Sequence, residues 1–221
     1  MNADSKAKYL IVMRHGAQCP NNGLTERGKQ QVQLAAQSLK TSGITPDSLI
    51  ISFPKRAQMT GSILSRHFQA ASTQTADLLD VLNPDFDIKT FLNAALRDKN
   101  TVILSGHDET IQRFGHNLLN DQDLITLFQI IPNDRILSCP HEGYTNLHIM
   151  ADNADMLILQ GQNNADDIDN WRLYGWMADG QIHYAHRNSH SASNFTNAKK
   201  LHEAADRIDL ALQVPAPPLE P

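Results

Sequence analysis

Arg14 and His15 directly follow the apolar run 9–13, and side chains of these two types at one place could bind an anion and attack it. A planar guanidinium makes paired hydrogen bonds to anionic oxygens, and a neutral imidazole nitrogen is a competent nucleophile at neutral pH. Gly16 comes next, and a glycine lets the backbone turn sharply or approach a ligand closely. This stretch is therefore the first candidate for a functional site.

Two further stretches have the same form. The β-branched run 101–105 ends in Gly106 and His107, and the run 48–52 leads to Arg56 near the start of an expected helix. Consecutive apolar residues are typical of strands that are buried on both faces, as in a parallel sheet. Open α/β sheets place their ligand sites at the carboxyl ends of such strands. The sequence therefore predicts that the arginines and histidines meet at one edge of a sheet.

Periodicity and turn residues predict the other elements. We expect Thr25 to cap a helix that ends near Gly43, and segment 76–82 to be either a short strand or one helix turn. An Asp-Gly pair at 179–180 predicts a β-hairpin over 171–184. Further helices are expected at 57–68, 88–96, 110–119, 123–131 and 196–213, and further strands at 143–150 and 156–160.

The order of these elements predicts a single α/β domain. Strands and helices alternate through the first half, which favours a three-layer α/β/α arrangement around a mostly parallel sheet with right-handed crossovers. A C-terminal β-hairpin and helix are expected in addition. We predict one domain over residues 1–214, with a core at about 8–150, a C-terminal extension at about 151–214 and a loose tail at 215–221.

Four motifs, taken in order, make the sequence resemble the histidine phosphatase superfamily, which includes phosphoglycerate mutases, acid phosphatases and phosphohistidine phosphatases. Each motif is short, but four in order, each after the expected strand or helix, are much more specific than one. The resemblance covers roughly the first half of the chain and implies a phosphoglycerate mutase-like fold. The motifs are Arg14-His15-Gly16, Leu24-Thr25 with Gly28, the stretch Ser52 to Thr60 with Arg56, and Gly106-His107.

The resemblance also implies a role for each residue. His15 is the nucleophile that accepts a phosphoryl group, and Arg14, Arg56 and His107 clamp the phosphoryl oxygens. We expect the other ring nitrogen of His15 to donate to a backbone carbonyl near Gly16, so that the correct tautomer faces the phosphorus. The family needs no metal and no cofactor, and no metal-ligand spacing in the sequence demands one.

A carboxylic acid is needed to protonate the leaving oxygen, and two positions are candidates. Asp108 follows the second histidine, and this His-Asp pair resembles the acid phosphatase branch, in which that aspartate is the donor. Asp80, or Asp77, lies where the mutase-like branch carries its acidic donor, although the glutamate usual there is missing. We favour Asp108 and place Asp80 second; an ordinary helix N-terminal acid is an equally good description of Asp108.

The spacing of the motifs bears on the substrate. The loop between Gly16 and Leu24 is short, and only about fifty residues separate Arg56 from His107, which leaves no room for a large cap. Both features resemble the compact phosphohistidine phosphatases more than the mutases. We predict a phosphatase acting on phosphomonoesters or phosphoramidates, protein phosphohistidine among them, through a phosphohistidine intermediate. A non-catalytic phospho-ligand binding or scaffold protein and a mutase-like phosphotransferase stay open as alternatives.

Composition limits the partners. A formal net charge of -5 argues against a general nucleic-acid surface, and no apolar run approaches membrane-spanning length. The polar segment 1–8 has no apolar core typical of a signal peptide, and Cys19 and Cys139 are too few for a disulfide framework. We therefore expect a cytoplasmic protein with a phosphorylated small molecule or phosphoprotein as its partner. The oligomeric state is left open.

Overall fold

The computed structural model of the chain describes residues 8–69, 72–78, 83, 85–141, 144–161 and 171–185. The predicted C-terminal helix at 196–213 and the tail at 215–221 lie outside the described residues. So does Asp80, the second candidate for the proton donor.

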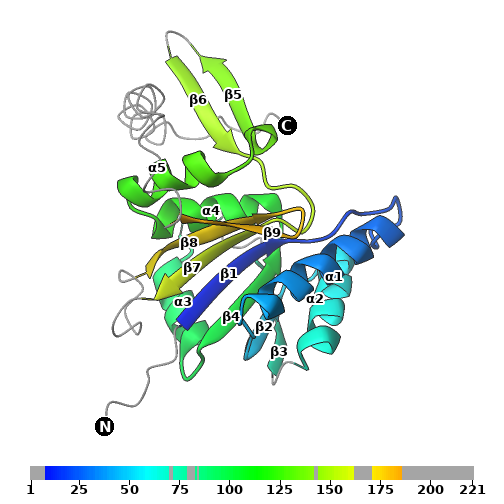
Figure 1. Cartoon of the computed structure of the whole chain (residues 1–221). Helices are drawn as coiled ribbons and strands as arrows, with labels where there is room; N and C mark the ends of the chain where they lie inside the picture. Colours follow the sequence, from blue (N-terminus) through cyan, green and yellow to red (C-terminus); the bar gives the residue numbers. More distant parts are fainter. Residues whose placement is uncertain are drawn as a thin grey trace.

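A seven-stranded sheet forms the centre of the molecule, in the order β3-β2-β4-β1-β7-β8-β9 (Figure 1). The first four strands in this order are parallel, and each later strand pairs antiparallel with its neighbour. The α/β class is thus confirmed, and the antiparallel strands make the sheet mixed. The strands are β1 (Lys8–Arg14), β2 (Ser48–Ile51), β3 (Ser72–Thr75), β4 (Thr101–Gly106), β7 (Met156–Gly161), β8 (Trp171–Ala178) and β9 (Gln181–Tyr184).

Helices cover both faces of the sheet, which gives the predicted three layers. The helices α1 (Glu26–Thr41) and α2 (Lys55–Phe68) lie on one face. The helices α3 (Ile88–Leu96), α4 (Asp108–Leu118) and α5 (Asp121–Ile130) lie on the other. Thr25 caps α1 as expected, because its side-chain oxygen accepts a hydrogen bond from the backbone N–H of Gly28.

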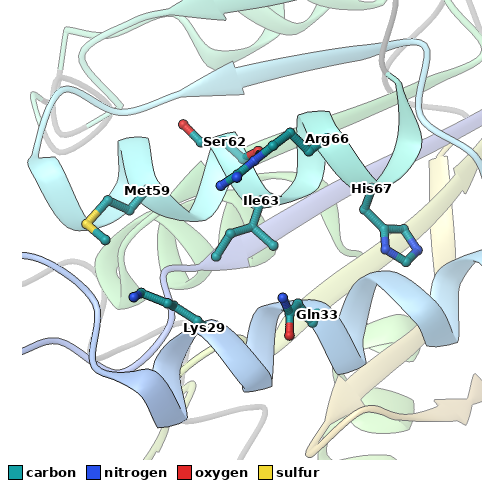
Figure 2. Close-up of a pocket in the computed structure, with 7 residues that line it drawn as sticks. All are labelled: Lys29, Gln33, Met59, Ser62, Ile63, Arg66 and His67. Carbon is teal, nitrogen blue, oxygen red and sulfur yellow. The ribbon is translucent and has the colours of Figure 1, made fainter.

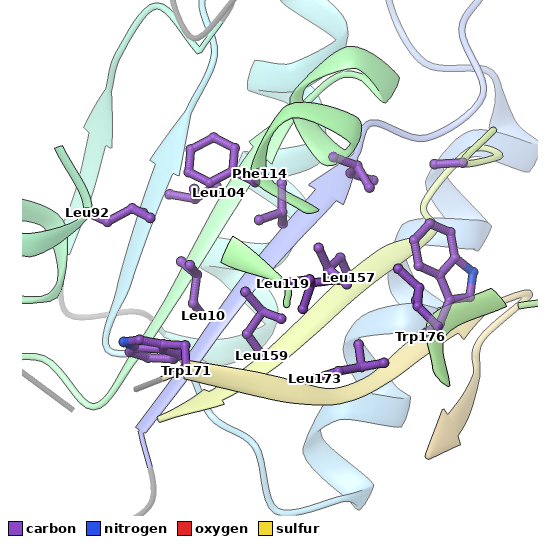
Figure 3. Packing of buried hydrophobic residues seen from close by; sticks show 14 of the residues in the cluster. Leu10, Leu92, Leu104, Phe114, Leu119, Leu157, Leu159, Trp171, Leu173 and Trp176 are labelled. Atoms are coloured by element: carbon purple, nitrogen blue, oxygen red, sulfur yellow. The ribbon is translucent and has the colours of Figure 1, made fainter. Parts of the chain in front are cut away.

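Strand β1 shows how the sequence builds two separate cores. Successive side chains of a strand point to opposite faces, so a continuous apolar run fills both sides. Leu10 and Val12 pack into the cluster on the side of α3, α4 and α5, whereas Ile11 and Met13 pack against α1 and α2. Figure 3 shows the first of these clusters, with Leu10 among the residues around Trp171.

The predicted hairpin at 171–184 is present and completes the sheet. Asp179 and Gly180 have φ values of 50° and 74°, and two positive φ values in a two-residue loop are what a tight antiparallel hairpin needs. The carbonyl of Gly180 accepts a hydrogen bond from Ser38 of α1 at 2.5 Å. The strands β7 to β9, which fall within the C-terminal extension predicted from residue 151, therefore continue the central sheet.

A second, two-stranded antiparallel sheet, β5 (Ile136–His141) and β6 (Tyr144–Ile149), projects beyond α5 (Figure 1). Strand β6 is the strand predicted at 143–150. Its partner β5 was not predicted. No helix among the residues that the structure describes is long and apolar enough to cross a membrane.

Candidate active site

The two histidines meet where the adjacent parallel strands β1 and β4 end. Arg14 is in register with Gly106, so His15 and His107 are each the next residue beyond a paired position. The backbone N–H of His15 donates to the carbonyl of Gly106 at 3.1 Å, which ties the two strand ends together. The imidazole rings lie 5.3 Å apart between centroids, edge to face, and both residues are at least 95% buried. Strand order alone thus brings residues 92 positions apart into one site.

Arg56 contacts both imidazole rings. It is in the first turn of α2, and its Nε donates to Nε2 of His15 at 2.8 Å. Its Nη2 lies 3.4 Å from Nδ1 of His107, and because a guanidinium has no acceptor, that ring nitrogen must accept. Nε2 of His107 then carries the proton and lies 3.4 Å from the hydroxyl of Ser52. One arginine therefore orients both histidines.

The tautomer of His15 is set by its neighbour. Nδ1 lies 2.8 Å from the carbonyl oxygen of Gly16, which can only accept, so Nδ1 carries the proton. This is the contact expected from the sequence. Nε2 is then left with a lone pair, directed at Arg56. Burial, together with the positive charge of Arg56, lowers the pKa of His15 to about 4, so the ring is neutral and nucleophilic at neutral pH.

Two glycines allow the loop after β1 to lie directly against α1. A Cβ atom on Gly16 would meet the carbonyl oxygen of Gly28 at 2.5 Å, and one on Gly28 would meet the carbonyl oxygen of Ala17 at 2.2 Å. Neither contact could be relieved by a side-chain rotation, because the atoms that are met belong to the backbone. The N–H of Gly16 also donates to the hydroxyl of Thr60 in α2 at 3.2 Å. The loop that carries His15 is therefore held by both helices of this face.

Arg14 projects from the end of β1 toward the segment before β7. Its Nη1 donates to the carbonyl oxygen of Ala151. Its Nε is buried and has no hydrogen-bond partner among the described residues. A buried N–H without a partner is costly, and a bound oxyanion would satisfy it.

Asp108, the favoured proton donor, begins α4 directly after His107. One carboxylate oxygen accepts from the backbone N–H of Ala151 at 2.8 Å and the other from the side chain of Gln112 at 2.9 Å. Burial raises the pKa of Asp108, although these bonds and the charge of Arg14 oppose the shift. A raised pKa is what a carboxylic acid needs to donate a proton near neutral pH.

Asp77, another acidic candidate, influences His107 through its charge. Burial, the largest cause, and the charge of Arg56 lower the pKa of His107, and the negative charge of Asp77 opposes this shift. Asp80 is outside the described residues. Sequence reasoning missed Ala151, and no signal could have revealed it, because it contributes only backbone atoms to the site.

A separate groove lies between α1 and α2, with a volume of about 720 Å³ (Figure 2). It contains none of the two histidines and two arginines of the site. Its ionisable residues are basic, and Met59 and Ile63 contribute apolar surface. The groove is lined by Lys29, Gln33, Met59, Ser62, Ile63, Arg66 and His67.

Within the described ranges, no group of three or more His, Cys, Asp or Glu side chains is arranged to hold a metal ion.

The lowered pKa of His15 predicts a pH dependence of stability. The unfolded chain takes up a proton on this histidine near pH 6.5, whereas the folded state resists protonation down to about pH 4. His15 therefore reduces the free energy of unfolding progressively as the pH falls from about 6.5 to about 4. An NMR titration of the ring should have its midpoint near pH 4, and a midpoint near 6.5 would contradict the buried, arginine-flanked geometry.

The fold brings two histidines and two arginines, His15, His107, Arg14 and Arg56, to one edge of the sheet. Residues 10–117, just under half of the chain, match the family model of the histidine phosphatase superfamily (branch 1). The resemblance stated from the sequence is thereby confirmed.

Two curated relatives share a shorter segment. Both are the mitochondrial serine/threonine-protein phosphatase Pgam5. The protein from Drosophila ananassae is 36% identical over 70 residues, 29% of this chain and 24% of the relative. The protein from Drosophila grimshawi is 38% identical over 65 residues, 27% and 22% of the two chains. The aligned segment thus spans about a quarter of these relatives.

Solved structures with low sequence identity share the fold. The SixA protein of Agrobacterium tumefaciens aligns with a TM-score of 0.54 at 20% identity, covering 77% of this chain and 98% of that one. The protein histidine phosphatase SixA complexed with tungstate aligns with the same TM-score at 15% identity, covering 77% and 97%. At such identities the likeness establishes the architecture and nothing about substrate.

Proposed function

We propose that the protein is a phosphatase that hydrolyses phosphomonoesters or phosphoramidates through a phosphohistidine on His15. One observation carries the proposal: the neutral His15 ring has Nε2 directed at Arg56, with Nδ1 held by a carbonyl. The match of residues 10–117 to the superfamily model supports the same reaction class. The names of the relatives, which refer to protein phosphatases, support a phosphorylated protein side chain as one substrate class.

The proposed first step is in-line transfer to the histidine. A phosphoryl oxygen displaces the contact between Arg56 and His15, and the Nε2 lone pair then attacks the phosphorus. The P–O or P–N bond to the leaving group breaks, and Asp108 gives its proton to the leaving atom. Arg14 and Arg56 stabilise the negative charge on the equatorial oxygens, which is the main source of catalysis in such reactions.

The second step returns the site to its starting state. Asp108, now a carboxylate, accepts a proton from a water molecule as that water attacks the phosphorus. The P–N bond to His15 breaks, its electron pair returns to Nε2, and inorganic phosphate leaves. Water is the only co-reactant, so the balance needs no cofactor.

Rapid-quench labelling tests this proposal. Wild-type protein should acquire an acid-labile, base-stable phosphoryl label and release phosphate, with an aryl phosphate and a phosphohistidine peptide compared side by side. Tight binding of the phosphopeptide with neither label nor phosphate release would instead establish a phospho-ligand binding protein. Transfer of the labelled phosphoryl group to a hydroxyl of a sugar phosphate or of a phosphorylated acid, in place of water, would establish a mutase-like enzyme.

Replacing Asp108 with asparagine should act selectively on poor leaving groups. An amide of the same shape can keep the bond from Ala151 but cannot donate an acidic proton. General acid catalysis is worth about 10²–10⁴-fold, so turnover of an alkyl phosphate should fall by that range, whereas a phosphoramidate or nitrophenyl ester should fall much less. Steady-state rates over a leaving-group series measure this, and an equal response across the series would place the proton donor elsewhere.

A further inference from the structure

We propose that the buried ion pair between Arg135 and Asp155 is a positioning device for the active site, because it fixes the segment 151–155 that holds Arg14, His15 and Asp108. Both partners lie beyond residues 10–117, the part that matches the superfamily. The inference rests on the proposed phosphatase function for its kinetic readout, but its binding readout does not depend on turnover.

The ion pair closes a turn of the chain. Nε of Arg135 donates to Oδ2 of Asp155 at 2.9 Å, and the aspartate side chain is only 1% exposed. The same oxygen accepts from the backbone N–H of Asp152 at 2.8 Å, and the N–H of Asp155 donates to the carbonyl of Asp152 at 3.0 Å. Breaking a buried pair on one side leaves an uncompensated charge, so this geometry is strongly held.

Arg135 reaches both ends of the segment. Its side chain binds Asp155 at the far end, and its backbone carbonyl accepts from the N–H of Met150 at 2.8 Å just before the near end. The arginine side chain is 9% exposed. One buried residue therefore fixes the segment at both ends.

The far end of the segment holds the end of β1. The carbonyl of Asp155 accepts from the backbone N–H of Arg14 at 3.0 Å, and the N–H of Ala154 donates to the carbonyl of His15 at 3.1 Å. The first bond is made by the residue directly before the proposed nucleophile, and the second by the nucleophile's own carbonyl. A shift of Asp155 would thus move the backbone that carries His15.

The near end holds two functional side chains through one residue. Ala151 accepts from the guanidinium of Arg14 with its carbonyl oxygen and donates to the carboxylate of Asp108 with its N–H. The peptide groups of Ala151 therefore set the distance between a phosphate-binding arginine and the favoured proton donor. No side chain at 151 could replace this role, because both contacts are made by the backbone.

The test compares Asp155→Asn and Arg135→Lys with the wild type at pH 7.5. This pH lies above the pKa of Asp155, which burial raises to about 6, so the wild-type pair is charged. Isothermal titration calorimetry with tungstate, an oxyanion of phosphate-like shape, measures the affinity of the site formed by Arg14 and its neighbours for an oxyanion. We expect both variants to bind tungstate roughly tenfold to a hundredfold more weakly, because small displacements of binding groups have effects of this order. Turnover of poor leaving groups should fall further than that of good ones, because Asp108 moves as well.

Two matched controls use the same guanidinium. Asp134 and Asp179 also pair with Arg135, but their side chains are 69% and 75% exposed and neither residue belongs to the segment 151–155. Asp134→Asn and Asp179→Asn should therefore bind tungstate like the wild type. Removal of a negative charge by itself would favour binding of an anion, so a loss in these variants equal to that of Asp155→Asn would mean that any disturbance of the Arg135 guanidinium weakens binding. That result would overturn the positioning role of the Arg135–Asp155 pair.

A purely structural role gives a different result. It would lower the free energy of unfolding of Asp155→Asn while its folded fraction bound tungstate with wild-type affinity, and that outcome overturns the proposal. If Asp155→Asn does not fold, Arg135→Lys decides, since it keeps the charge but loses the fork that contacts the segment. Wild-type protein that binds tungstate and hydrolyses no phosphate would refute the proposed function and leave the comparison of affinities valid.

Discussion

His15→Ala is expected to abolish turnover of every phosphate substrate and to leave no phosphoryl label on the protein. The reason is that the variant has no side-chain nitrogen at the position of the attacking lone pair, while Arg14, Arg56 and His107 remain to bind the substrate. Loss of a covalent nucleophile typically lowers kcat on the order of 10⁴-fold or more. Phosphate release and rapid-quench labelling measure the two effects on one sample.

The fold should survive this substitution. His15 is buried and neutral, so its removal takes away no charge. It does remove two hydrogen bonds, the Nδ1 bond to Gly16 and the bond that Arg56 donates to Nε2. Each lost hydrogen bond costs about 1 kcal/mol. His116→Ala is the matched control, because His116 is an exposed histidine in the last turn of α4. A wild-type rate in His15→Ala, with its thermal unfolding close to that of the control, would exclude His15 as the nucleophile.

The central elements were predictable because each depends on a local pattern. The runs that became β1 and β4 are continuous and apolar, and Thr25 has the side chain and the position of an N-cap. The polar strand β3, Ser-Thr-Gln-Thr, has no such pattern, because it is an exposed edge strand with little apolar surface to bury. Its pairing with β2 is decided by the backbone, which sequence periodicity does not report.

The candidate site likewise has one part that the sequence predicts and one part that it does not. His15, Arg56 and His107 could be placed together because parallel strand ends share one edge. The segment 151–155 could not be found, because it contributes peptide groups and one buried aspartate from far along the chain. Asp152 and Asp155 also look like ordinary turn residues in the sequence. Contacts made by the backbone carry no residue-type signal, so only the three-dimensional structure reveals them.

Arg56→Met should lower kcat/KM roughly 10³-fold, which is the order expected when an arginine that stabilises phosphoryl charge is removed. Arg56 donates to His15 and faces His107, so its loss removes a phosphate ligand and frees both rings at once. The positive charge that helps to lower the pKa of His15 is lost as well, so the midpoint of the His15 titration should move upward from about 4. Steady-state kinetics and an NMR titration of the ring measure the two effects.

The conservative and control variants separate charge from geometry. Arg56→Lys keeps the charge but lacks the planar fork, so we expect a smaller fall in kcat/KM and a His15 midpoint that stays nearer to 4. Arg66→Met, on the same helix, removes an exposed arginine whose Nε donates to the carbonyl of Ser62 within the helix, and it should match the wild type in both measurements. A value of kcat/KM for Arg56→Met within a few fold of the Arg66→Met control would mean that the phosphoryl oxygens are bound without Arg56. The proposed first step, in which substrate displaces Arg56 from His15, would then be wrong.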